Sequence, residues 1–177
     1  DDGAYILAET DSNVDGVIFS RSDLILNGTG TLTIAANQKH GVVSKDHLMI
    51  TGGTYHVTAN GHAFSGKDSV RIADGTFFLN SQTDAIQSDN AEDAALGYIY
   101  IRDGSFTIVS GTDAIQAETE LTIENGTFDI QTGGGAAQAE PKISAGWNPW
   151  NTSDDAADSE SAKGLKAGTA LTISGGT

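Results

Sequence analysis

A repeat of 22 residues is the feature of this sequence that most limits its possible folds. One small residue recurs in every repeat, at Gly41, Ala63, Ala85, Ala114 and Gly164, with spacings of 22, 22, 29 and 50 residues. A second marker, a Gly-Thr or Gly-Ser pair, shows the same two enlarged spacings. Two markers that share their insertions indicate a repeat architecture in which each repeat is one structural unit.

Apolar residues alternate with variable ones inside each repeat, which is the pattern of short β-strands. One triplet precedes the Gly-Thr/Ser corner, as in Val70-Arg71-Ile72, and another follows it, as in Phe106-Thr107-Ile108. A third short apolar segment contains Phe64 in one repeat and Ile115 in another. Three strands in 22 residues correspond to one coil of a parallel β-helix.

The sequence therefore predicts an all-β chain that forms a right-handed parallel β-helix of about six coils, as a single domain over residues 1–177. Coils stack about 4.8 Å apart, so equivalent residues form ladders. The expected members are Ile50, Ile72, Ile101, Ile123 and Ile173 in an aliphatic ladder, and Tyr55, Phe77, Phe106 and Phe128 in an aromatic one. A leucine-rich repeat is disfavoured because no repeat contains a helical segment.

Two loop insertions interrupt the regular coils, at about 89–97 and 131–163. Insertions on a solenoid lie at its surface and often carry function. The last repeat stops before its second strand, so we expect the chain to be a fragment of a longer protein. An open coil edge also leaves unpaired strand groups, which makes end-to-end self-association a possible alternative.

The charge balance restricts the partners of the protein. Nine Lys and Arg residues stand against 24 Asp and Glu, giving a net charge of −15. A nucleic-acid ligand is disfavoured because it requires a basic surface, and no apolar run approaches the roughly 20 residues of a membrane span. The absence of cysteine excludes disulfides and thiolate zinc sites. This composition favours the binding of cations.

Acidic residues are predicted to gather at one corner of neighbouring coils, where a hard cation could bind. Calcium prefers six to eight oxygen ligands, several from carboxylates. The candidate ligands are Asp84, Asp89, Asn90, Asp93, Asp113 and Glu118. Alternatively, the corner is a solvated acidic face in which aspartates cap turn amides. Lys45 and Lys67 are in register with Asp89 and Glu118, and we interpret them as neutralising charges.

Exposed aromatic residues are candidates for contact with sugar rings, whose apolar faces pack on flat side chains. Trp147 and Trp150 lie three residues apart in the second insertion, and Tyr98 and Tyr100 follow the first. The alternative for the tryptophans is that they attach the long insertion to the outside of the solenoid.

Catalytic motifs are absent, because the sequence contains neither a GxSxG nucleophile elbow nor an HExxH metal motif. Elimination on a uronate requires a basic group near the sugar, and Arg71 is predicted to point away from the acidic corner. Hydrolysis by two carboxylates is disfavoured because Asp84 and Asp113 are better placed to share a cation. We therefore expect no catalytic residues.

Several strings, including Asp113-Ala114-Ile115-Gln116-Ala117-Glu118 and the segment 161–168, resemble the clostridial-type carbohydrate-binding β-helix proteins. The resemblance extends from about Asp15 to Thr177. It implies a shape similar to pectate lyases, bound calcium, an extracellular or cell-surface location, and non-catalytic binding of acidic galacturonans and cellulose. His40, His62 and Ala63 depart from the family, which often has Asp and Gly there.

The sequence leaves three hypotheses for function. The first is calcium-dependent binding of acidic plant cell-wall polysaccharide such as polygalacturonate. Here calcium would bridge protein and uronate carboxylates, since the ion reverses the local charge. The second is a structural surface solenoid or filament-forming subunit that binds no specific glycan. The third is a pectate-lyase-like enzyme.

Overall fold

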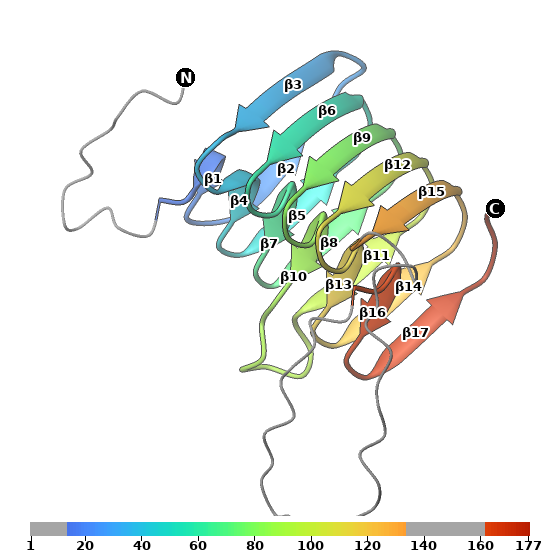
Figure 1. Ribbon diagram of the computed structural model, residues 1–177. Coiled ribbons are helices and arrows are strands. Elements are labelled where there is room, and N and C mark those ends of the chain that lie inside the picture. The colour runs from blue at the N-terminus through green and yellow to red at the C-terminus, as the bar shows by residue number, and fades with distance from the viewer. Residues whose placement is uncertain (1–13, 134–161) are drawn as a thin grey trace, which may run out of the picture.

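The protein is a solenoid with three parallel sheets, as seen in a computed structural model that describes residues 14–133 and 162–177 (Figure 1). Each strand from β1 to β14 pairs with the strand three positions later along the chain. This arrangement confirms the predicted right-handed parallel β-helix. Each coil contributes one strand to each sheet, which accounts for the repeat of 22 residues.

The first two sheets have six strands each. Sheet A consists of β1 (Gly16–Ser20), β4 (His40–Ser44), β7 (Phe64–Gly66), β10 (Ile86–Ser88), β13 (Ile115–Ala117) and β16 (Leu165–Ala167). Sheet B consists of β2 (Leu24–Leu26), β5 (His47–Ile50), β8 (Ser69–Ile72), β11 (Tyr98–Ile101), β14 (Glu120–Ile123) and β17 (Ala170–Ile173). Only two residues separate β4 from β5, so sheets A and B meet at a sharp corner.

Sheet C has five strands: β3 (Thr31–Ala36), β6 (Thr54–Ala59), β9 (Thr76–Ser81), β12 (Ser105–Ser110) and β15 (Thr127–Thr132). β15 extends to Thr132, so the first residues of the expected second insertion continue this strand. Within the described ranges, no helix is long and apolar enough to cross a membrane.

The interior is filled by the predicted ladders, except that Ile173 on the last coil is 57% exposed. Ile50, Ile72 and Ile101 are aligned by the register of sheet B and are completely buried. In the aromatic ladder, the rings of Phe77 and Phe106 stack with centroids 4.7 Å apart. The stacking of Tyr55 on Phe77 and of Phe128 on Phe106 extends this ladder over four coils. Burial of these side chains is the main source of stability, because apolar area removed from water drives folding.

The glycine corner before each aromatic residue is required by its backbone conformation. Gly104 has a φ of 144°, and a Cβ built there would lie 2.9 Å from Cε2 of Phe106. Only glycine adopts this conformation readily, and only glycine leaves room for the ring. The Gly-Thr/Ser marker of the sequence therefore reports the tight packing of the aromatic ladder against the turn.

The first insertion, residues 89–97, joins β10 to β11 and is organised by a buried asparagine. The Asn90 side-chain oxygen accepts hydrogen bonds from the amides of Glu92 at 2.9 Å and Asp93 at 3.1 Å. Its amide nitrogen donates to Asp68 at 2.6 Å on the preceding coil. The loop therefore has a fixed starting conformation beside the sheet A corner.

Candidate functional site

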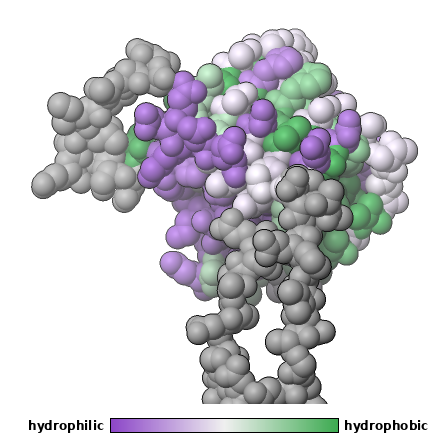
Figure 2. All heavy atoms as spheres, viewed as in Figure 1, coloured by the Kyte–Doolittle hydropathy of each residue, from purple (hydrophilic) through white to green (hydrophobic). Residues whose placement is uncertain are grey.

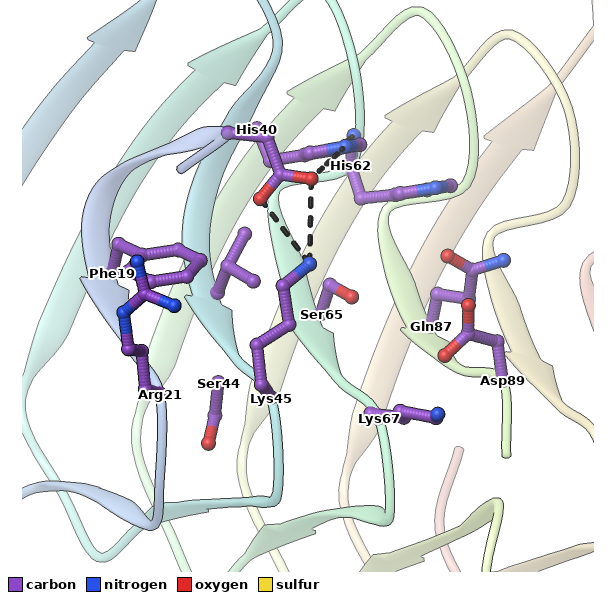
Figure 3. A pocket seen from close by; sticks show the side chains of 12 residues that line it. Phe19, Arg21, His40, Ser44, Lys45, His62, Ser65, Lys67, Gln87 and Asp89 are labelled. Carbon is purple, nitrogen blue, oxygen red and sulfur yellow. Dashed lines mark hydrogen bonds and ion pairs between the residues drawn. The ribbon is translucent and has the colours of Figure 1, made fainter. Parts of the chain in front are cut away.

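A groove of about 480 Å³ lies on the outer face of sheet A, over the first four coils (Figure 3). Its lining residues are Asp15, Phe19, Arg21, His40, Val43, Ser44, Lys45, His62, Ser65, Lys67, Gln87 and Asp89. Hydrophilic side chains gather over the side of the solenoid that contains β1, β4 and β7 (Figure 2). Most of the lining is polar, so it offers many donors and acceptors of hydrogen bonds.

One column of this face consists of cations on three successive coils. Arg21, Lys45 and Lys67 directly follow β1, β4 and β7, where the sheet register aligns Ser20, Ser44 and Gly66. We call these three residues the cation column. Figure 3 shows them along one edge of the groove, with Asp89 on the following coil. Parallel stacking places neighbouring members about 4.8 Å apart along the solenoid axis.

Carboxylates of the protein already contact two of these cations. Nζ of Lys45 lies 3.4 Å from both carboxylate oxygens of Asp15, and Nζ of Lys67 lies 3.8 Å from Glu92, which is 83% exposed. A pair as exposed as Lys67 with Glu92 contributes only about 0–1 kcal/mol, whereas Asp15 in the other pair is only 18% exposed. A carboxylate of a ligand can therefore replace Glu92 at small cost.

The opposite edge of the groove carries two stacked histidines. The rings of His40 and His62 are parallel, with centroids 4.7 Å apart. The His62 amide donates to Nδ1 of His40 at 2.9 Å, so this nitrogen of His40 carries no proton. Nδ1 of His62 lies 3.1 Å from the carbonyl of Asp84, and it donates because a carbonyl can only accept.

Burial, and then the neighbouring His62, hold the pKa of His40 below its usual value of 6.5. Both effects disfavour the imidazolium form. The positive charge of the groove at neutral pH therefore comes from the cation column and not from His40.

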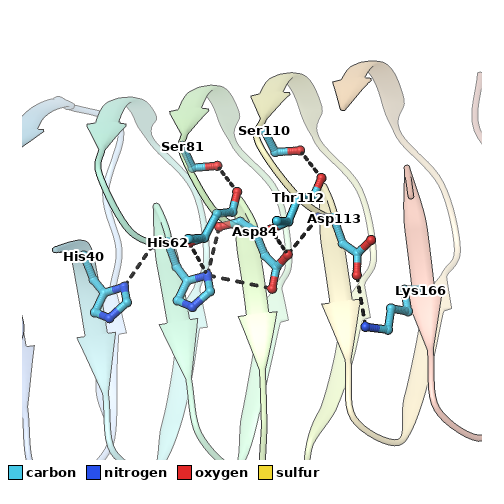
Figure 4. A network of polar contacts seen from close by, with 9 residues as sticks. His40, His62, Ser81, Asp84, Ser110, Thr112, Asp113 and Lys166 are labelled. Atoms are coloured by element: carbon cyan, nitrogen blue, oxygen red, sulfur yellow. Dashed lines mark hydrogen bonds and ion pairs between the residues drawn. The ribbon is translucent and has the colours of Figure 1, made fainter. Parts of the chain in front are cut away.

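Two buried aspartates continue this edge on the next coils (Figure 4). Oδ1 of Asp84 accepts from the hydroxyl of Thr112 at 2.6 Å and from the amide of Asp113 at 2.8 Å. Oδ1 of Asp113 accepts from the Lys163 amide at 2.7 Å, and its Oδ2 lies 3.1 Å from Nζ of Lys166. The two side chains are only 5% and 4% exposed. Each carboxylate therefore caps an amide of the following coil, which is the alternative role considered for this corner.

The six expected calcium ligands do not form one cluster. In the described part of the chain, no group of three or more His, Asp and Glu side chains is placed to hold a metal ion. Asp84 and Asp113 are engaged by amides, and Asn90 holds the first insertion. The exposed Asp89 and the half-buried Glu118 instead follow β10 and β13, in line with the cation column.

The candidate aromatic residues lie elsewhere. Tyr98 and Tyr100 are half-buried on the outer face of sheet B and do not line the groove. A hydrogen bond with Glu124, followed by burial, raises the pKa of Tyr100. Trp147 and Trp150 lie outside the described residues.

Sequence analysis missed the cation column as a binding element. Lys45 and Lys67 were placed in the correct register but interpreted only as neutralising charges. Arg21 was not connected to them because 24 residues, and not 22, separate it from Lys45. A search for like charges after every sheet A strand would have found the column.

Comparison with known proteins assigns the chain to a family. Residues 1–177 match the family described as "Carbohydrate-binding domain-containing protein", and the chain belongs to this family. A solved structure with the same fold is the gadolinium derivative of a polysaccharide lyase-like protein from C. thermocellum. The two chains are 26% identical with a TM-score of 0.75, over 94% of this chain and 57% of the other. Among curated proteins, none matches the sequence.

Proposed function

We propose that this protein binds acidic polysaccharide without cleaving it, and that the polymer lies along the solenoid axis on the outer face of sheet A. The observation that carries this proposal is the cation column. Three cations line one groove on consecutive coils of a protein whose net charge is −15. Such a local reversal of charge attracts anions to this face and repels them elsewhere.

The groove suits a sugar polymer in its geometry as well as its charge. A polyuronate laid along the axis passes Arg21, Lys45 and Lys67 in turn, and those of its carboxylates that face the protein can meet these cations. Ser65 and Gln87 stand between the two edges of the groove and can hydrogen-bond hydroxyl groups. Phe19, over which Nζ of Lys45 lies at 5.6 Å, offers an apolar surface for a sugar ring.

The proposed ligand is polygalacturonate or a related acidic polymer of the plant cell wall, encountered outside the cell. Calcium supports this binding beyond the cation column, where Asp89 and Glu118 replace the lysines. A calcium ion shared between a protein carboxylate and a uronate would convert repulsion into attraction. In this proposal the ion takes one carboxylate from the protein, Asp89 or Glu118, and its remaining oxygens from the uronate and from water. Cellulose binding would require a different, uncharged surface.

The proposal is tested by titrating polygalacturonate into the protein in chelator and in calcium. The double variant Lys45→Gln/Lys67→Gln should weaken binding about tenfold, since two exposed charge contacts of roughly 0.5–1 kcal/mol each are lost. The matched control Lys39→Gln/Arg102→Gln removes the same charge outside the groove and should change affinity less than twofold. Equal losses in both variants would show that only net charge matters.

Two further readouts separate the alternative functions. Release of unsaturated uronate, followed by ultraviolet absorbance, would show lyase chemistry and contradict a purely binding role. No affinity for the polymer in either buffer would contradict the proposal and favour a structural role.

A further inference from the structure

We propose that the face of sheet A selects glycans in which a run of about three free carboxylates is followed by uncharged residues, and that Asp89 and Glu118 end this run. The inference rests on the proposed function and specifies its ligand. In the absence of calcium, it makes a partly esterified polyuronate, or an acidic segment beside a neutral one, the preferred class over a continuous polyanion.

The charge of the cation column reverses abruptly between the third and the fourth coil. Strands β7 and β10 are neighbours in sheet A, yet Lys67 follows the first and Asp89 the second. On the fifth coil Glu118 follows β13, and its amide bonds to the Ser88 carbonyl of the coil before. A polymer in register with the column therefore meets cations on three coils and then two carboxylates.

The opposite edge of the face changes at the same place. Beyond Asp15 of the first coil, whose carboxylate is paired with Lys45, this edge carries His40 and His62 on the second and third coils. Asp84 and Asp113 occupy it on the fourth and fifth. The two aspartates are held in place by amides of the next coil. Carboxylates thus border both sides of the face on the fourth and fifth coils.

Uncharged side chains lie between these carboxylates. The register of β10 and β13 aligns Gln87 with Gln116 in the centre of the face. Primary amides donate and accept hydrogen bonds, so they suit hydroxyl groups or an ester carbonyl. On the sixth coil the aligned residue is Lys166, whose ammonium group is 3.1 Å from Asp113.

A fourth free carboxylate would therefore lie within one coil of Asp89. This distance of about 5 Å is well below the Debye length of about 10 Å at 0.1 M salt, so screening leaves the repulsion largely intact. Glu92 adds a further negative charge beside Lys67, at 3.8 Å from its ammonium group. An ester or a neutral sugar avoids this repulsion and can use the glutamine amides.

The experiment measures dissociation constants for oligogalacturonates of two to six residues by NMR titration, in chelator and at low ionic strength. For the native chain, affinity should increase up to the trimer and then stay level or decrease. In the variant Asp89→Lys/Glu118→Lys, the fourth and the fifth galacturonate of the oligomer should each increase the affinity about two- to fivefold. The milder variant Asp89→Asn/Glu118→Gln keeps the side-chain shapes and should remove the decrease in affinity beyond the trimer. It tests the same inference if the lysine variant does not fold.

The matched control is Glu120→Lys/Asp129→Lys, which makes the same change in net charge at exposed positions outside sheet A. It should keep the native dependence on length. A native affinity that grows steadily to the hexamer in chelator would overturn the inference while leaving the proposed function intact. An unchanged length dependence in both sheet A variants would also overturn it. Failure of the native chain and the lysine variant to bind any oligomer, in chelator and again in calcium, would refute the proposed function itself.

Discussion

Replacing Asp84 by alanine should destabilise the fold without any cation being present. The carboxylate is 5% exposed and accepts two hydrogen bonds on the next coil, from Thr112 and from the amide of Asp113. A hydrogen bond to a charged group contributes about 1.5–3 kcal/mol. The loss of both bonds should therefore cost about 3–5 kcal/mol, a large share of the roughly 5–15 kcal/mol of a typical domain.

The assay is urea unfolding followed by circular dichroism, with the protein in excess chelator. Asp84→Asn keeps an oxygen acceptor but loses the charge, so it should show about half of this loss. Asp129→Ala removes one carboxylate from an exposed position of β15 and should change stability by less than about 0.5 kcal/mol. The capping role is refuted if Asp84→Ala loses less than about 1 kcal/mol in chelator. A larger loss that occurs only in calcium would identify Asp84 as an ion ligand.

Three further predictions concern the fold. Phe106→Ala should lower the free energy of unfolding in urea by about 3–5 kcal/mol, because the ring stacks on both Phe77 and Phe128. The control Val109→Ala, at an exposed position, should lower it by less than about 1 kcal/mol. Similar losses in the two variants would contradict the aromatic ladder. Gly104→Ala should lower stability by about 1–3 kcal/mol, and an unchanged melting temperature would contradict the strain at its φ of 144°. The pKa of His40 is lowered by folding, so neutral His40 contributes to the stability of the fold above pH 6.5. This contribution is lost as the pH falls below 6.5 toward the pKa of His40 in the folded protein. Urea midpoints should therefore decrease less on acidification in His40→Gln than in the native chain, and parallel decreases would contradict this role.

The fold was predictable from sequence because its determinants are periodic. Parallel pairing places Phe77, Phe106 and Phe128 in one ladder whatever the surrounding loops do, so their spacing alone revealed the coil. The glycine at each corner was equally informative, since its conformation is required by the ring that follows.

The site was predictable only in part. Sequence showed that Asp84 and Asp113 occupy one corner of adjacent coils, but not which donors reach them. Those donors are amides 29 and 50 residues further along the chain, and only the stacked coils bring them close. Burial then determines that these carboxylates act as caps. The groove beside Lys45 forms only when successive coils stack, so no single repeat reveals it.

The bond between Oδ1 of Asp113 and the amide of Lys163 also bears on how this solenoid can diversify. Together with the bond from the Ala114 amide to the Lys163 carbonyl, it fixes the sixth coil on the fifth across fifty residues of chain. The entropy of closing a loop increases by only about 0.6 kcal/mol for each doubling of its length. The register of the sixth coil on the fifth is therefore set by these contacts and depends only weakly on how many residues separate them along the chain. A solenoid held together in this way can vary the length of its repeats without losing the stacking of its coils.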